Sequence, residues 1–214
     1  VSLKTEVDER LIRKVAPDAV VVANSSPYFI PDIPGMNRKN VFTIPMMSKL
    51  AQVPMKMFGP DKLASMSEKF FPVGKKVLIW GAGAEGAQCA EFMRKRGKEI
   101  VLVAENDDIG GMIPLKYKER ILPWFERKNV QIVRNSTVVE FTKKGAIVRG
   151  ADGSEELIAC DSMMVMLPEE RDPEFFDMVR SIVPEAYEIG STLGGENAFF
   201  KHAFADGRRV GCLI

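Results

Sequence analysis

The sequence predicts an α/β fold, a Rossmann-like doubly wound parallel sheet with a small antiparallel β meander. Two patterns lead to this prediction. Between residues 75 and 133, apolar runs of strand length alternate with segments of helical periodicity, as in parallel sheets whose strands are joined by helices. Three shorter strand candidates follow at 137–141, 146–149 and 155–159, and the glycines between them favour hairpin turns.

A strand, a glycine turn and a helix form the centre of the predicted fold. The strand candidate 75–80 leads into Gly81-Ala82-Gly83-Ala84-Glu85-Gly86, and residues 84–96 have helical spacing. In such a unit Gly81 allows a tight turn, Gly83 lets a pyrophosphate approach the backbone, and Gly86 lets helix and strand pack closely. The free N–H groups and positive dipole end of the helix would hold the phosphates. We therefore expect residues 81–86 to bind a cofactor.

Glu105 is the second candidate for the same site. It ends the apolar run 99–104, roughly 20 residues past the turn, where a carboxylate accepts the ribose hydroxyls of NAD and repels the extra phosphate of NADP. The pattern therefore favours NADH. Two alternatives stay open, a site for a methyl donor such as S-adenosylmethionine and a glycine turn without a ligand.

The remaining elements follow from periodicity and turn signals. We expect further helices at 7–16, 114–128, 173–182 and 197–210, the last capped by Asn197, and further strands at 19–23, 41–44, 130–133, 162–167 and 186–189. Residues 45–72 are rich in methionine, which suits both irregular packing and adaptable contact surfaces. We favour a partly helical loop packed on its own domain over a docking surface.

Composition excludes several functional classes. The 214 residues carry a net charge of +1 with acids and bases interspersed, which argues against a nucleic-acid partner. No apolar run approaches the roughly 18 residues of a membrane span, and no signal-peptide pattern opens the chain. We therefore expect a cytoplasmic protein without a membrane partner, and whether it forms a homo-oligomer is left open.

Few residues could serve redox, metal or catalytic chemistry. Cys89, Cys160 and Cys212 include no Cys-x-x-Cys pair, so we expect buried thiols and no local dithiol or iron–sulfur site. A single histidine, His202, leaves almost no material for a metal site or a histidine-based triad, and we expect a structural role for it. No catalytic acid, base or nucleophile is assigned, and no tyrosine is followed by a lysine four residues later.

The order of these pieces resembles the nucleotide-binding domains of the pyridine nucleotide-disulphide oxidoreductase superfamily. The likeness is greatest to the C-terminal part of NADH:flavin oxidoreductases related to 2,4-dienoyl-CoA reductase, 2-enoate reductase and trimethylamine dehydrogenase. It is carried by Asp18 to Ala23, Ile33-Pro34-Gly35, Gly74 to Ile79 with the glycine turn, Gly97 to Ile100 with Glu105, Ile189-Gly190, and Ala205-Asp206-Gly207.

The resemblance implies three parts. Residues 74–183 would be an NAD(P)H-binding Rossmann domain, 46–73 a methionine-rich connecting segment, and 1–45 with 184–214 part of an incomplete flanking domain of the FAD or ADP type. The chain opens at Val1 without an initiator methionine, which suggests a fragment of a longer protein or an excised domain. The resemblance also implies that hydride passes to a flavin held elsewhere in the full protein. FMN and an iron–sulfur cluster would belong to the remaining domains of that protein, so this chain alone would not carry out the full reaction.

Several positions depart from the pattern of that superfamily. Ala23-Asn24-Ser25 stands where Ala-Thr-Gly is usual in its members, and Gly190-Ser191 stands where a flavin-contacting Gly-Asp is usual. Both changes weaken the case for FAD. Glu85 places a carboxylate inside the turn, and Trp80 is bulky enough to crowd or stack on a nucleotide. These departures motivate a second hypothesis, a degenerate nucleotide-binding fold with a structural or docking role.

Overall fold

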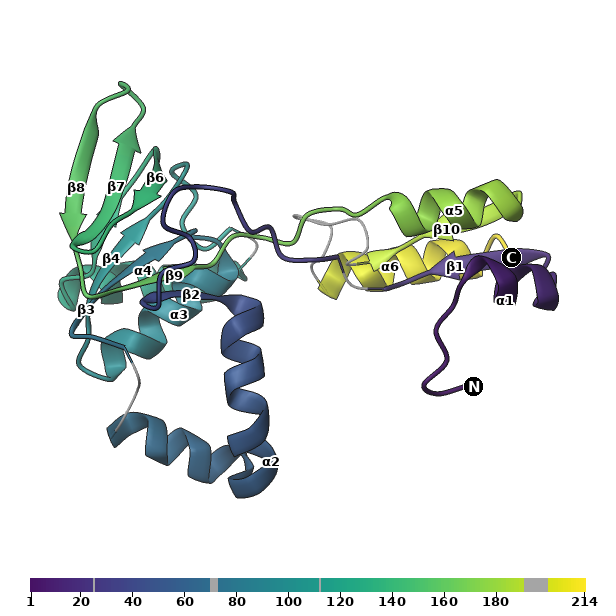
Figure 1. Cartoon of the computed structure of the whole chain (residues 1–214), viewed down its shortest axis with the longest axis horizontal. Coiled ribbons are helices and arrows are strands. Elements are labelled where there is room, and N and C mark those ends of the chain that lie inside the picture. The colour runs from purple at the N-terminus through teal and green to yellow at the C-terminus, as the bar shows by residue number, and fades with distance from the viewer. Residues whose placement is uncertain (25, 70–72, 112, 191–199) are drawn as a thin grey trace. The chain divides into compact units, whose positions relative to one another are not determined.

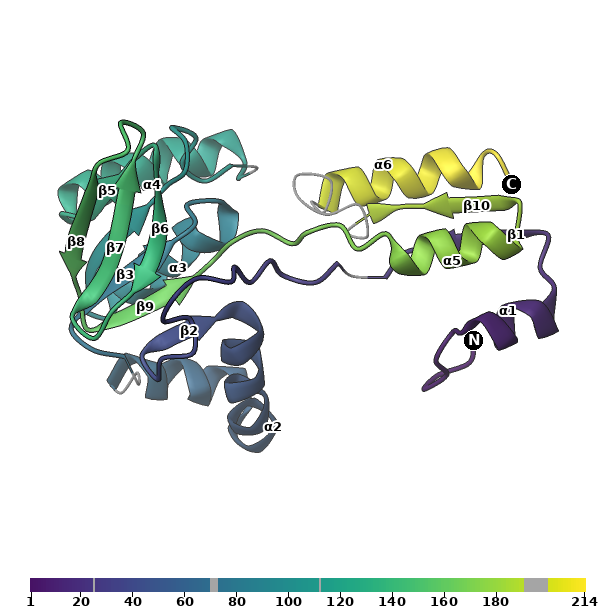
Figure 2. The same cartoon turned by 45° about the horizontal axis from the view of Figure 1, so that its top comes forward.

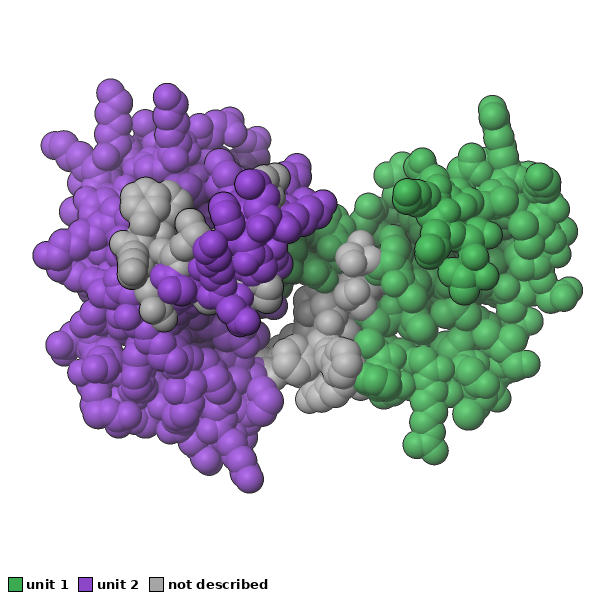
Figure 3. Space-filling view, turned by 90° about the horizontal axis from the view of Figure 1, so that it is seen from below, with its two compact units in different colours: residues 1–29, 168–214 green, residues 30–167 purple. Residues whose placement is uncertain are grey.

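The computed structural model describes residues 1–24, 26–69, 73–111, 113–190 and 200–214. The chain divides into two compact units, which Figure 3 distinguishes by colour. Unit 1 comprises residues 1–29 and 168–214, and unit 2 comprises residues 30–167. Each unit has its own hydrophobic core, so the two are described separately.

Unit 2 is built on a five-stranded parallel sheet in the order β2-β9-β3-β4-β5. The strands are β2 (Val41–Thr43), β3 (Lys76–Trp80), β4 (Glu99–Val103), β5 (Gln131–Val133) and β9 (Ser162–Val165). In the centre, Val77 lies opposite Ile100 on one side and Ser162 on the other. The continuous apolar runs of β3, β4 and β9 form these strands because a central parallel strand is buried on both faces.

Two helices cover one face of this sheet (Figure 2). They are α3 (Ala84–Lys95), between β3 and β4, and α4 (Leu115–Arg127), between β4 and β5. Ala87 and Ala90 of α3 are fully buried, as are Ile121 and Phe125 of α4. The small alanine side chains let α3 pack closely against the sheet, which fixes the position of its amino end.

An antiparallel meander covers the other face (Figure 2). Its strands are β6 (Ser136–Phe141), β7 (Gly145–Gly150) and β8 (Glu155–Ala159), in the order β6-β7-β8. Phe141 and Ala146 are fully buried and pack with Leu78, Val101 and Met163 of the parallel sheet. The α/β class, the parallel sheet and the meander are thus confirmed.

The methionine-rich segment forms α2 (Ile44–Lys69), which consists of two helical stretches that meet at a kink. Gly59 has φ +76° and ψ 167°, which breaks the helical backbone there. Ile44 and Met47 pack against the core of unit 2. Other described side chains of α2 are exposed, namely Met46, Leu50, Met55, Met57 and Phe58. Among the described side chains of α2, those seen to pack on the core of unit 2 lie in its first turn, and Figure 1 shows this first part of α2 running away from the sheet before the helix bends.

Unit 1 contains a two-stranded parallel sheet of β1 (Ala19–Val22) and β10 (Glu185–Glu188). Its helices are α1 (Glu9–Val15), α5 (Glu174–Ile182) and α6 (Phe200–Gly211). Ile12, Val22, Val179 and Val183 form its small core. Asp8 caps α1, since its carboxylate accepts a hydrogen bond from the Leu11 N–H at 2.8 Å. The expected cap Asn197 lies outside the described residues, as do Ser25 and Ser191.

The division between the units differs from the boundaries expected at 45 and 184. The segment 41–43 belongs to unit 2, because β2 pairs with β9 through Val41 and Met163. Helix α5 belongs to unit 1, because its Val179 packs with Ile12 and Val22. Long-range strand pairing and core packing decided both boundaries, and neither is visible in local sequence patterns.

Candidate dinucleotide-binding site

The candidate site lies at the carboxyl edge of the sheet in unit 2, where the strand order reverses. From β3 the chain continues to β4 on one side, whereas β9 lies on the other side. Ligands of open α/β sheets bind at such a switch point. The Gly81 N–H donates to the Val103 carbonyl at 3.0 Å, and the Met166 N–H donates to the Trp80 carbonyl at 2.7 Å. These bonds fix the start of the glycine turn between the ends of β4 and β9.

Packing requires two of the three glycines. Gly81 has φ +102°, and a Cβ there would lie 2.3 Å from the Met166 carbonyl oxygen. A Cβ on Gly86 would lie only 1.7 Å from the Gly81 carbonyl oxygen. The strand, the turn and α3 therefore approach one another too closely for any side chain at these positions.

Gly83 differs from the other two glycines because it is exposed and has open space beside it. Within the described residues, the one atom within 4 Å of a Cβ built there is the Glu85 Oε2, at 3.9 Å. Gly83 is the N-cap of α3 and provides no side-chain cap. The N–H groups of a first helical turn have no intrahelical partner, and together with the helix dipole they attract an anion. The geometry fits a phosphate approaching Gly83.

The alanines of the turn are held by the protein itself. Ala82 is 7% exposed, and its carbonyl accepts a hydrogen bond from the Gly110 N–H at 2.7 Å. Ala84 packs against the helix-side core. These two residues shape the turn and present little surface to a ligand.

Glu85 is exposed in the first turn of α3. Its carboxylate is the nearest group to the open space beside Gly83. An acid in the first turn interacts favourably with the helix dipole, but it would repel a pyrophosphate in the same place. Glu85 therefore opposes anion binding at the turn.

Trp80 points away from the glycine turn. Its side chain is 3% exposed and packs edge to face with Phe141, at 6.2 Å between ring centroids, in the core between the sheet and the meander. Its indole N–H finds no hydrogen-bond partner among the residues that the structure describes. The expectation that Trp80 could crowd or stack on a nucleotide is wrong, because side chains alternate between the two faces of a strand.

Glu105 stands two residues beyond β4 and is exposed. Its Oε1 accepts a hydrogen bond from the Thr137 hydroxyl at 3.0 Å. The backbone beside it is tied to the β5–β6 connection, since the Ala104 N–H donates to Val133 at 2.8 Å and the Ser136 N–H donates to Ala104 at 2.9 Å. Because β3 and β4 are neighbours in the sheet, Glu105 after β4 and the glycine turn after β3 lie at the ends of neighbouring strands. Thr137 was missed from sequence, because nothing local connects it to an acid 32 positions earlier.

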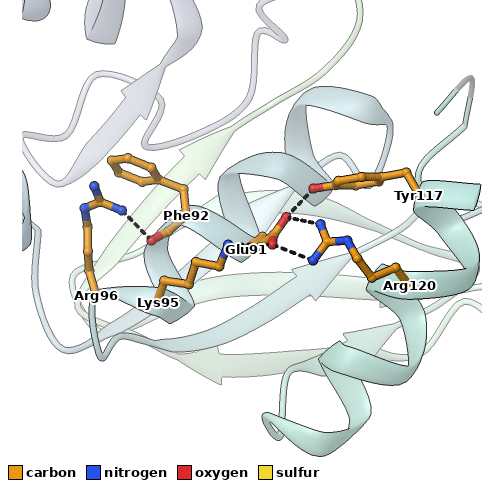
Figure 4. Close-up of polar contacts among 6 residues, drawn as sticks. All are labelled: Glu91, Phe92, Lys95, Arg96, Tyr117 and Arg120. Atoms are coloured by element: carbon orange, nitrogen blue, oxygen red, sulfur yellow. Dashed lines mark hydrogen bonds and ion pairs between the residues drawn. The ribbon is translucent and has the colours of Figure 1, made fainter. Parts of the chain in front are cut away.

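A cluster around Glu91 joins α3 to α4 (Figure 4). The Glu91 side chain is 9% exposed and accepts hydrogen bonds from both Arg120 Nη atoms at 3.1 Å and from the Tyr117 hydroxyl. Lys95 Nζ lies 2.8 Å away. Burial raises the pKa of Glu91, but hydrogen bonds from Arg120, Lys95 and Tyr117 outweigh it and lower the pKa from 4.5 to about 2. The spacing of Glu91 and Lys95 was the only trace of this cluster in the sequence.

Two of the three cysteines, Cys89 and Cys160, are poor nucleophiles within this fold. Burial raises the pKa of the Cys89 thiol to about 12 and that of Cys160 to about 11. Cys160 is buried, Cys89 is half-buried and Cys212 is exposed, so the expectation of three buried thiols is wrong for Cys212. Among the residues that the structure describes, no three acidic, cysteine or histidine side chains are placed to hold a metal ion, and no helix is long and apolar enough to cross a membrane.

Comparison with known proteins places these features in a family. The family model described as pyridine nucleotide-disulphide oxidoreductase matches residues 2–176. Among curated proteins, cinnamate reductase from Clostridium sporogenes is 25% identical over 148 residues, covering 66% of this chain and 22% of that protein. Bilirubin reductase from Mediterraneibacter gnavus is 25% identical over 171 residues, covering 80% of this chain and 23% of that protein.

A solved structure shows the same fold. The complex of 2-naphthoyl-CoA reductase with 2-naphthoyl-CoA matches with a TM-score of 0.69 and 23% identity, over 99% of this chain and 29% of that chain. The chain spans about a quarter of the length of the two curated relatives, 22% and 23%.

Proposed function

Since the chain belongs to the pyridine nucleotide-disulphide oxidoreductase family, we propose that unit 2 binds NADH at the carboxyl edge of its sheet. Gly81, Gly83 and Gly86 form the pyrophosphate turn in this proposal, and Glu105 accepts hydrogen bonds from the hydroxyls of the adenosine ribose. The rest of the full-length protein holds the flavin.

One observation carries the proposal. Gly83 combines exposure, open space and the uncapped first turn of α3, and the carboxylate of Glu105 lies at the end of the adjacent strand β4. An anion site and a ribose acceptor at neighbouring strand ends are the two contacts that an NADH-binding fold of this class requires.

The residues of this chain contribute binding and orientation. Bound NADH would supply a hydride, which is the chemistry of the cofactor. Unit 1 is the counterpart of the flanking FAD or ADP domain in this proposal, and FMN and an iron–sulfur cluster belong to further domains of the full protein. The reaction resembles that of enoate and dienoyl-CoA reductases, with the substrate bound outside this chain.

Isothermal titration calorimetry with NADH, NADPH and ADP-ribose tests the proposal. We expect NADH and ADP-ribose to bind more tightly than NADPH. Glu105→Ala should weaken NADH binding and reduce the preference for NADH over NADPH. Glu99→Ala is the matched control, because Glu99 is an exposed acid at the opposite end of the same strand. An absence of NADH binding at millimolar concentration would exclude this function.

A structural or docking role is the second candidate. It is favoured by the exposed Met46, Leu50 and Met57 of α2 and by the carboxylate of Glu85 beside Gly83. The same titration separates the two, since a degenerate fold binds neither nucleotide. Preferential NADH binding that disappears in Glu105→Ala would count against it.

A further inference from the structure

The β5–β6 connection of unit 2, residues 134–135, and the first residues of β6 lie along the segment that carries Glu105. Val133 and Ser136 bond to the backbone of Ala104 on both sides of the connection, at 2.8 and 2.9 Å. The Thr137 hydroxyl then donates to Glu105 Oε1 at 3.0 Å. A residue of the antiparallel meander thus reaches the side chain at the end of β4.

Two further acids follow Glu105 after β4, Asp107 and Asp108, and their carboxylates lie beside cationic side chains. Asp108 Oδ1 lies 2.6 Å from Lys118 Nζ. Asp107 Oδ1 accepts a hydrogen bond from the Asn135 amide at 3.3 Å and lies 3.9 Å from Arg134 Nε. Cations therefore lie beside both aspartates, whereas the hydrogen bond to Glu105 comes from the neutral hydroxyl of Thr137. In the described part of the chain, Glu105 is the one of these three acids that forms no ion pair within 4 Å.

We infer that Thr137 is a positioning residue that sets the preference for NADH through Glu105, an inference that rests on the proposed function. An ionised carboxylate has two accepting oxygens. The Thr137 hydroxyl occupies Oε1 and limits the rotation of the side chain, which leaves Oε2 to accept a ribose hydroxyl. A carboxylate held in this orientation also repels a 2′-phosphate more strongly than one that can turn away.

The test removes the hydroxyl while keeping the shape of the side chain. Thr137→Val retains β-branching and suits a strand, and Thr137→Ser restores the donor as a matched control. Dissociation constants for NADH and NADPH are measured by nicotinamide fluorescence. We expect Thr137→Val to weaken NADH binding roughly three- to tenfold, the range for one lost hydrogen bond, with a smaller effect on NADPH, and Thr137→Ser to behave like the wild type.

A double-mutant cycle with Glu105→Gln distinguishes positioning from general packing. If Thr137 acts through Glu105, Thr137→Val has little further effect in the Glu105→Gln background. Equal loss for NADH and NADPH, an undiminished loss in that background, or failure of Thr137→Ser to restore affinity would overturn the inference while leaving the proposed function intact. A wild-type chain that does not bind NADH would overturn both.

Discussion

Replacing Glu91 by glutamine would break the cluster that joins α3 to α4. Glu91 is 7% exposed and receives bonds from Tyr117 and Arg120 of α4, as well as from Lys95 one turn further along α3 (Figure 4). The substitution keeps the shape of the side chain but removes its charge. It leaves the tyrosine hydroxyl and the guanidinium facing an amide, which can accept at one oxygen only.

The structure sets the size of the effect. The pKa of Glu91 falls from 4.5 to about 2, which at 1.36 kcal/mol per unit corresponds to about 3 kcal/mol of stabilisation at neutral pH. Arg120 and Lys95 are about half exposed, at 49% and 56%, and regain water when the cluster is lost. We therefore expect Glu91→Gln to lower the free energy of unfolding by about 2–3 kcal/mol at pH 7.

Urea unfolding followed by tryptophan fluorescence measures this loss. Both tryptophans, Trp80 and Trp124, lie in unit 2, so their emission reports on the unit that contains the cluster. Glu99→Gln is the control, because its ion pair with Lys75 joins side chains that are 54% and 79% exposed. Such a pair contributes about 0.5 kcal/mol or less.

The pH dependence gives the sharper result. Because the folded-state pKa is depressed, the stabilisation is fully present above the unfolded value of 4.5 and is lost as pH falls toward about 2. The difference between wild type and Glu91→Gln should stay constant from pH 7 to about 5.5 and fall to roughly half by pH 3. A difference that does not change with pH, or one no larger than that of Glu99→Gln, would refute the reasoning.

Four further predictions concern the turn and the strand before it. Gly86→Ala should destabilise unit 2 by several kcal/mol (on the order of 3) in urea unfolding, since its Cβ would clash with the Gly81 carbonyl. Gly83→Ala should leave stability within about 1 kcal/mol and weaken NADH binding in a titration, because its Cβ enters the open space. Glu85→Ala should tighten NADH binding about two- to fivefold at low salt and less at high salt, and an unchanged affinity would show that the carboxylate is too distant to matter. Trp80→Phe should change the free energy of unfolding by only about 1 kcal/mol, since removal of the unpaired indole N–H offsets the lost volume.

Features that depend on neighbouring residues in the chain were predictable. The runs Val77 to Trp80 and Ile100 to Val103 are apolar because both faces of a central parallel strand are buried. Gly81 and Gly86 could be identified as turn and packing positions because glycine alone meets those backbone demands. The glycine turn, Glu105 and the order of strands and helices were therefore accessible from sequence.

Contacts between distant segments were not predictable. The Thr137 hydroxyl on Glu105, the cluster of Glu91 with Arg120, and the burial of Trp80 against Phe141 each join residues that local patterns do not connect. The same limit explains the shifted boundary between the units. Pairing of β2 with β9 is a long-range contact, and a strand of three residues leaves no sign of its partner in its own sequence.

By itself, the sequence determined the α/β class, the position of the glycine turn and the acid at the end of the next strand, because helix periodicity, strand hydrophobicity and glycine geometry act over a few residues. Only the tertiary structure decided which groups face the turn. It turned Trp80 away from the turn and brought Thr137 to Glu105. The physical reason is that the orientation of a side chain depends on which layer it packs against. The helices cover one face of the sheet and the meander covers the other, and both come from segments distant in the chain.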